Sequence, residues 1–174
     1  DIVLNELSTK FNSLKIWSAA CSIGAEPYSL AIILHKNSIN LRHKILGTDI
    51  DDRILERARE ARYKEHEIRN VKKETLNEYF TIKNKNYHLS PVIKNMVKFK
   101  KHDLILDDYE KGFHAIICRN VVIYFKRETK DRIYKKLSES LVTGGLLFIG
   151  ATESIFNPAA YGLKKVSTFI YEKA

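Results

Sequence analysis

Short apolar runs alternate along this chain with stretches in which apolar residues recur at helical spacing. Residues 15–20 form the first run, and residues 27–35 carry apolar side chains on one helical face. A second run at 44–48 ends at Asp49, and a helix from 52 to about 61 follows. The pattern predicts repeated strand–turn–helix units.

The same alternation continues toward the C-terminus. Residues 113–118 predict a third strand, residues 127–142 an amphipathic helix, and residues 146–150 a further strand after two glycines. Strands that alternate with helices are typical of a parallel sheet covered on both faces. We therefore expect an α/β fold of one domain, since 174 residues suit a single core.

Two segments interrupt the alternation. Residues 79–99 contain short extended pieces and an Asn/Lys turn at 83–86, which predict a small antiparallel β insert. Residues 163–171 alternate loosely and predict a closing hairpin.

The charge is positive and uneven. The chain has 30 Lys and Arg against 21 Asp and Glu, a net charge of +9. Residues 57–101 hold 13 of the basic and 5 of the acidic residues, so most of the excess lies there. This basic stretch is either ordinary solvated surface or a docking face for an acidic partner.

Composition excludes several classes of protein. The longest apolar run, at 145–151, is too short to span a bilayer, so we expect no membrane insertion. Cys21 and Cys118 are far apart, which predicts reduced, buried thiols and a cytoplasmic protein. The six histidines show no ligand spacing, so no metal is expected. The chain starts at Asp1, and we expect it to be part of a longer protein.

Acidic residues stand where the predicted strands end, which is where α/β sheets bind ligands. Asp49 lies 25 residues after Gly24, close to the spacing of acids that bind ribose hydroxyls. No G-x-G-x-x-G phosphate loop is present, so the expected ligand has a ribose without a pyrophosphate. S-adenosylmethionine fits, and Glu26 could bind its sulfonium or amino group. The alternatives stay open: Glu26 could serve the helix dipole, Asp49 could cap a helix, and Asp103 could simply end a strand.

Residues 17–31 read Trp-Ser-Ala-Ala-Cys-Ser-Ile-Gly-Ala-Glu-Pro-Tyr-Ser-Leu-Ala. They resemble the first motif of the CheR-type chemotaxis receptor glutamate O-methyltransferases, W-S-A-G-C-S-T-G-E-E-P-Y-S-L-A. The resemblance continues in family order through Gly-Thr-Asp-Ile-Asp at 47–51, Asp-Leu at 103–104 and Cys-Arg-Asn-Val-Val-Ile-Tyr-Phe at 118–125. It ends with Gly-Gly-Leu-Leu-Phe-Ile-Gly at 144–150 and Thr-Glu-Ser at 152–154.

The resemblance implies a class I, Rossmann-like methyltransferase domain over residues 1–174, with a mixed, mostly parallel sheet. It implies S-adenosylmethionine as cofactor, S-adenosylhomocysteine as product, and glutamyl methyl esters formed on chemoreceptors. It makes Tyr124 the catalytic residue near the transferable methyl group. The cofactor-binding residues that it implies are Ala20, Glu26, Asp49, Ile50, Asp103, Leu104, Arg119 and Asn120. Among these, Glu26 contacts the cofactor, Asp49 the ribose, the 103–104 pair the adenine, and the 119–120 pair the methionine part. The expected partners are acidic helical segments of methyl-accepting chemoreceptors, and this chain is expected to be a monomer.

Departures from the family pattern leave two other functions open. Ala20, Ile23 and Ala25 replace the common Gly, Thr and Glu, and the family's N-terminal helical domain is not found in this chain. One alternative is therefore a catalytically weak module that binds cofactor or docks to a receptor. The other is a nucleic-acid methyltransferase, suggested by the basic stretch and by Asn-Pro-Ala-Ala-Tyr at 157–161, although no nucleic acid is expected.

Overall fold

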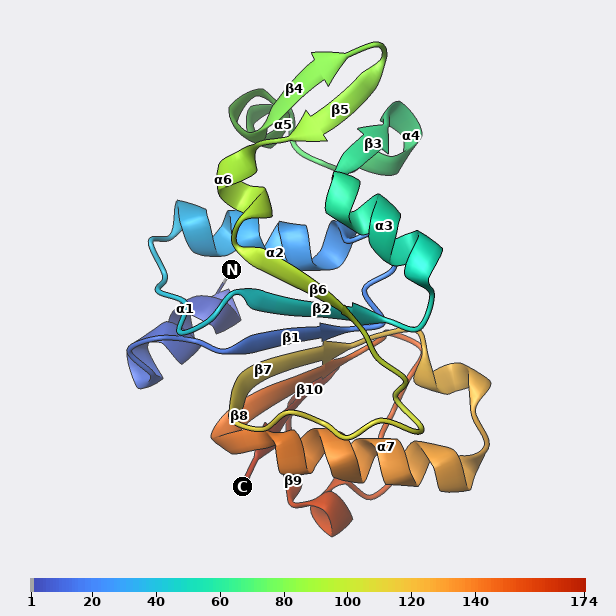
Figure 1. Cartoon of the computed structure of the whole chain (residues 1–174). Coiled ribbons are helices and arrows are strands. Elements are labelled where there is room, and N and C mark those ends of the chain that lie inside the picture. The colour runs from blue at the N-terminus through green and yellow to red at the C-terminus, as the bar shows by residue number, and fades with distance from the viewer. Residues whose placement is uncertain (1) are drawn as a thin grey trace.

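The computed structural model describes residues 2–174, and its centre is a seven-stranded sheet with helices on both faces (Figure 1). The sheet order is β6-β2-β1-β7-β8-β10-β9. Its strands are β1 (Ile16–Ala19), β2 (Ile45–Asp49), β6 (Val97–Lys101), β7 (Phe113–Cys118), β8 (Leu141–Ile149), β9 (Leu163–Ser167) and β10 (Ile170–Lys173). The helices are α1 (Ile2–Lys10), α2 (Ala25–Lys36), α3 (Asp52–Glu60), α4 (Glu65–Ile68), α5 (Lys73–Tyr79), α6 (Pro91–Lys94) and α7 (Arg127–Ser140), with short 3-10 turns η1 (Val122–Tyr124) and η2 (Pro158–Tyr161).

Burial on both faces explains why the central strands are continuous apolar runs. Every residue of β1 and of β7 is buried, as a parallel strand between two helical layers requires. Strands β6, β2, β1, β7 and β8 run parallel, whereas β10 is antiparallel to both β8 and β9. The predicted α/β class and the C-terminal hairpin are confirmed.

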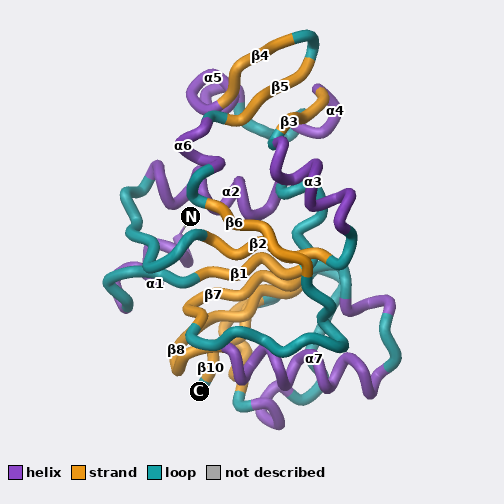
Figure 2. The backbone as a smooth tube through the Cα atoms, in the orientation of Figure 1, coloured by secondary structure: helices purple, strands orange, loops and turns teal. Residues whose placement is uncertain are grey.

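Successive residues of a strand face opposite sides, so β7 contributes to two separate cores. Ala115 and Ile117 join the cluster formed with α1 and α2, whereas Ile116 and Cys118 join the cluster formed with α7. Figure 2 shows the same layering, with the strands between the two groups of helices. Side-chain packing on both faces of the sheet therefore fixes the position of the strand ends.

The small antiparallel sheet differs from its prediction in extent. Its order is β3-β5-β4, with β3 (Arg62–Lys64), β4 (Phe80–Lys83) and β5 (Asn86–Leu89). The expected insert at 79–99 was therefore wrong at both ends: the sheet takes in residues 62–64, and β6 instead pairs in parallel with β2 at the edge of the main sheet. β6 is short and mostly exposed, so its pattern does not reveal which sheet it joins. The predicted turn is confirmed, with Asn84 and Lys85 at φ 49° and 60°.

Two further differences concern boundaries. Helix α7 ends at Ser140 rather than 142, and β8 begins at Leu141 rather than 146. The two glycines that were expected to precede the strand lie inside β8, where the pairing with β7 shifts register and Gly144 has φ 75°. Helix α1 was not predicted.

Candidate active site

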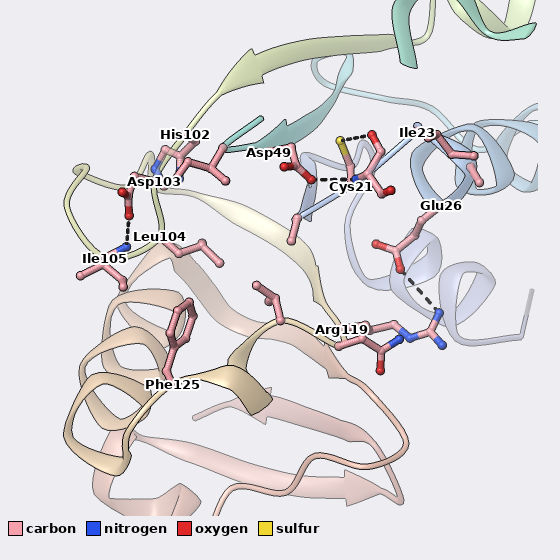
Figure 3. Close-up of a pocket in the computed structure, with 16 residues that line it drawn as sticks. Cys21, Ile23, Glu26, Asp49, His102, Asp103, Leu104, Ile105, Arg119 and Phe125 are labelled. Carbon is pink, nitrogen blue, oxygen red and sulfur yellow. Dashed lines mark hydrogen bonds and ion pairs between the residues drawn. The ribbon is translucent and has the colours of Figure 1, made fainter. Parts of the chain in front are cut away.

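A cavity of about 640 Å³ opens at the carboxyl ends of β1, β2, β6 and β7 (Figure 3). All eight residues predicted to bind cofactor line it: Ala20, Glu26, Asp49, Ile50, Asp103, Leu104, Arg119 and Asn120. The other lining residues are Cys21, Ser22, Ile23, Ala25, His102, Ile105, Val121 and Phe125. The site is therefore assembled from four loops that are distant in sequence.

The turn between β1 and α2 forms one wall of the cavity. Ala20, Ser22 and Gly24 all have positive φ, at 57°, 51° and 82°. At Gly24 a Cβ would lie only 3.0 Å from the Phe99 ring, so this position is tight as well as left-handed. Ala20 adopts the same left-handed region with a side chain, at a position where the family motif has glycine.

Glu26 lies in the first turn of α2 and faces the cavity. The Ser18 hydroxyl donates to its Oε1 at 2.7 Å, and Arg119 pairs with its Oε2 at 3.5 Å. Burial raises the pKa of the Glu26 carboxyl, while the hydroxyl and the guanidinium oppose that rise. Glu26 thus places a carboxylate at the N-terminus of α2, where it interacts favourably with the helix dipole, and it also offers this carboxylate to a cationic ligand.

Asp49 ends β2 and holds two turns together. Its Oδ2 accepts a hydrogen bond from the Ser22 N–H at 2.9 Å, and its Oδ1 accepts one from the Asp51 N–H at 3.2 Å. The N-cap of α3 is Asp51, which accepts from the N–H groups of Arg53 and Ile54 at 2.8 and 3.3 Å. The helix-cap alternative for Asp49 is therefore wrong.

The adenine side predicted from the family is the loop after β6. Asp103 Oδ1 accepts from the N–H groups of Ile105 and Leu106 at 2.7 and 3.1 Å, which fixes the loop as an Asx turn. Asp103 therefore does more than end a strand. Leu104 is buried in the core that packs under α7, yet it also lines the cavity.

Tyr124 lies in η1 and is 80% exposed. It is outside the set of lining residues, although Val121 and Phe125 on either side of η1 belong to that set. The structure therefore places Tyr124 at the solvent side of this loop, and its catalytic role remains a prediction.

The lining residues that the sequence analysis missed share a signal. Each lies within three residues of a predicted cofactor-binding residue along the chain, except Phe125, which follows the predicted catalytic residue Tyr124. Among them, Cys21 was expected to be a buried thiol; burial raises its pKa to about 12, which keeps it protonated. Burial likewise raises the pKa of Cys118.

The charge of the lining tests whether S-adenosylmethionine fits. Three carboxylates and one guanidinium face the cavity, with apolar side chains from Ile50, Leu104, Ile105, Val121 and Phe125. A net negative lining repels phosphates and attracts S-adenosylmethionine, which carries a sulfonium, an ammonium and one carboxylate. The volume also lies within the range of about 300–1,000 Å³ for small-molecule sites. The residues fit this cofactor.

Residues 2–174 contain no group of three or more His, Cys, Asp or Glu side chains placed to hold a metal ion. No helix in this part of the chain is both long and apolar enough to cross a membrane.

Solved structures resemble this fold. A putative O-methyltransferase from Nostoc punctiforme superposes with a TM-score of 0.53 at 15% identity, covering 91% of this chain and 39% of that one. Phosphoethanolamine N-methyltransferase 1 from Haemonchus contortus gives 0.51 at 10% identity, covering 82% and 23%. At these identities the likeness concerns the fold alone.

Relatives at higher identity are chemotaxis protein methyltransferases. The protein from Listeria monocytogenes is 45% identical over 92% of this chain, and that from Borreliella burgdorferi is 36% identical over 86%. The protein from Salmonella typhimurium is 33% identical over 90%. The matched chain spans 61%, 55% and 57% of these relatives' lengths.

The family model described as "CheR methyltransferase, SAM binding domain" matches residues 1–170. The resemblance in the sequence motifs is thereby confirmed. This chain belongs to the CheR methyltransferase family, within which it forms the domain that binds S-adenosylmethionine.

Proposed function

We propose that this chain is the core of an enzyme that transfers a methyl group from S-adenosylmethionine to glutamate side chains of chemoreceptors, forming glutamyl methyl esters. The observation that carries the proposal is the convergence of all eight predicted cofactor residues on one cavity with a net negative lining. The chemotaxis names of the relatives support the choice of substrate.

Each part of the cofactor has a matching group in the cavity. Asp49 would accept the ribose hydroxyls, and Glu26 with Ser18 beside it would hold the amino group. Asp103 and Leu104 would flank the adenine, and Ile50 would cover it with an apolar side chain. Ala20, Arg119 and Asn120 would line the path of the methionine part.

When bound, S-adenosylmethionine supplies an electrophilic methyl group. A glutamate carboxylate has a reference pKa of about 4.3, so it is ionised at neutral pH and needs no general base. The chain's task is then to align the carboxylate with the methyl group and to exclude water, and alignment can be worth about 7–11 kcal/mol at its upper limit. The Tyr124 hydroxyl, at the solvent side of η1, would orient the incoming carboxylate.

The surface near the cavity suits a protein substrate. Ile50 lines the cavity and is 59% exposed, and Leu106, next to the lining residue Ile105, is 80% exposed. Tyr124 adds a third exposed apolar side chain at the same edge of the sheet. Apolar groups left in water near a catalytic cavity are typical of a surface that a macromolecule covers.

Acidic helical segments of the receptors are the proposed partners, because the basic stretch at 57–101 covers α3, the small sheet and β6. None of residues 57–101 lines the cavity, but β6 ends at Lys101, directly before the lining residue His102, so the basic stretch reaches the site at this end. A single copy of the chain contains every residue of the proposed site, which is why we propose a monomer.

The competing nucleic-acid function finds less support. Its motif at 157–161 lies in and beside η2, where the Tyr161 hydroxyl donates to Asp131 at 2.8 Å. None of these residues lines the cavity. A box of this kind acts on a base only when it reaches the cofactor's methyl group.

A methyl-transfer assay tests the proposal. The chain is incubated with S-adenosylmethionine labelled in the methyl group and with a purified cytoplasmic fragment of a chemoreceptor, and the protein is then treated with alkali. Volatile labelled methanol is expected, because methyl esters hydrolyse under base whereas methylated amines and bases do not. Asp49→Ala serves as the control that removes cofactor binding. Cofactor binding without transfer would favour the weak-module alternative, and label on RNA or DNA would refute the proposal.

A further inference from the structure

We infer that Glu153, which follows β8, is a positioning residue that holds the cavity wall formed by residues 119–122 in the shape that receives the cofactor. The inference rests on the proposed function, because this wall carries Arg119 and Asn120. Glu153 itself does not line the cavity.

Three backbone N–H groups donate to this one carboxylate. Oε2 accepts from Asn120 at 3.0 Å and from Gly150, while Oε1 accepts from Val122 at 3.2 Å. The residue is only 7% exposed, and no ion pair to it occurs among residues 2–174. A buried carboxylate without a cationic partner depends on such donors, so the loop and the acid stabilise each other.

The backbone around Asn120 needs this support. Asn120 has φ 58°, a left-handed conformation that a residue with a side chain adopts at a cost of about 1 kcal/mol. The chain then enters η1, a turn too short to satisfy its own first N–H groups. Glu153, which does not line the cavity, supplies the acceptor for the first N–H group of η1, that of Val122, and for the N–H group of Asn120 before it.

Gly150 makes room for the carboxylate. A Cβ at this position would lie 2.5 Å from Glu153 Oε2 and 2.6 Å from Asn120 Oδ1. Since Ile149 pairs with Cys118 in the sheet, the ends of β7 and β8 are adjacent, and Glu153 joins the loops that follow them. Gly150, Glu153 and Asn120 therefore form one packed unit behind the cavity wall.

This unit explains how residues on an exposed loop can bind a ligand. The N–H groups of Asn120 and Val122 point to Glu153, while Arg119, Asn120 and Val121 line the cavity. Loss of the carboxylate would leave two loop N–H groups unpaired and let the wall move. We expect the effect to reach the cofactor through Arg119 and Asn120, without any contact from Glu153.

Glu153→Gln is the variant of choice, because it keeps the size of the side chain and replaces one of the two acceptor oxygens with an amide NH2 group, which cannot accept from an N–H donor. We expect calorimetry to show S-adenosylhomocysteine binding weakened by about tenfold or more. In the unliganded chain, amide hydrogen exchange should become faster at Asn120 and Val122. The matched control is Glu67→Gln, which also removes a carboxylate that accepts a backbone N–H, from Lys64 at 2.8 Å, but away from the cavity. The control should lower the melting temperature and leave the affinity unchanged.

The outcomes separate the inference from the proposed function. If Glu153→Gln binds S-adenosylhomocysteine as the wild type does, or if the two amides keep their protection, the inference is overturned. If the wild type binds none, the proposed function fails, and the exchange rates of the unliganded chain still decide the inference. Should Glu153→Gln fail to fold, Gly150→Ala replaces it: its Cβ would displace the carboxylate, and the same loss of amide protection is expected.

Discussion

Asp49 offers the sharpest test of the cofactor site, because both of its carboxylate oxygens already have a backbone partner. The Ser22 N–H binds one oxygen at 2.9 Å and the Asp51 N–H binds the other at 3.2 Å. Each oxygen retains acceptor capacity for one ribose hydroxyl. The side chain is thus oriented before any ligand arrives.

Asp49→Asn should weaken S-adenosylhomocysteine binding by about 10- to 100-fold. Hydrogen bonds to a charged group contribute about 1.5–3 kcal/mol each, and the amide removes the charge and one acceptor. Isothermal titration calorimetry of the wild type and the variant measures the ratio of dissociation constants, and circular dichroism verifies that both are folded.

Asp51→Ala is the control for the neighbouring loop. It removes the N-cap of α3, whose side chain accepts from Arg53 and Ile54, and should cost about 0.5–2 kcal/mol of stability. The affinity for S-adenosylhomocysteine should stay within twofold of the wild type. The assignment of the ribose to Asp49 is refuted if Asp49→Asn binds normally, or if Asp51→Ala loses as much affinity.

Three other changes probe different parts of the molecule. Glu26 has a pKa raised by burial, so the folded state binds its proton more tightly than the unfolded state, and stability falls as pH rises from about 4.5 through the raised pKa. Glu26→Gln should therefore flatten this part of the curve of stability against pH, measured by urea unfolding. It should also weaken S-adenosylhomocysteine binding about tenfold. A steeper curve would contradict the raised pKa of Glu26. Gly47→Ala places a Cβ 2.8 Å from the Phe99 ring and should lower the free energy of unfolding by about 1–3 kcal/mol. The double variant with Phe99→Leu should recover part of this stability. Equal melting temperatures for the wild type and Gly47→Ala would disprove the close contact. Tyr124→Phe should lower the rate of methyl transfer and leave S-adenosylhomocysteine affinity unchanged, because the side chain lies outside the cavity lining; full turnover in the variant would exclude a role for the hydroxyl.

Local signals in the sequence were enough to predict the central strands and three acids that line the cavity, Glu26, Asp49 and Asp103. Two-sided burial produces continuous apolar runs, so β1 and β7 were recognisable without a structure. Asp49 stood out by its place after a strand and its distance from Gly24. The family motifs pointed to Arg119 and Asn120, because matching a motif requires only the order of residues in the sequence and no knowledge of their contacts.

The tertiary structure decided what depends on distant partners. β6 is short and mostly exposed, and only its hydrogen bonds to β2 show that it belongs to the main sheet. The exposure of Tyr124 likewise follows from the path of η1 rather than from its neighbours in sequence.

Glu153 shows the same division most clearly. From the sequence it is one acid after a strand, whereas in the fold it accepts N–H groups from Asn120 and Val122, more than thirty residues earlier. The sequence determines which residues form strands and which acids follow them, because both depend on near neighbours. Which strand ends become adjacent, and therefore which acid supports which loop, depends on the order and register of the sheet, and these arise only when the whole core packs.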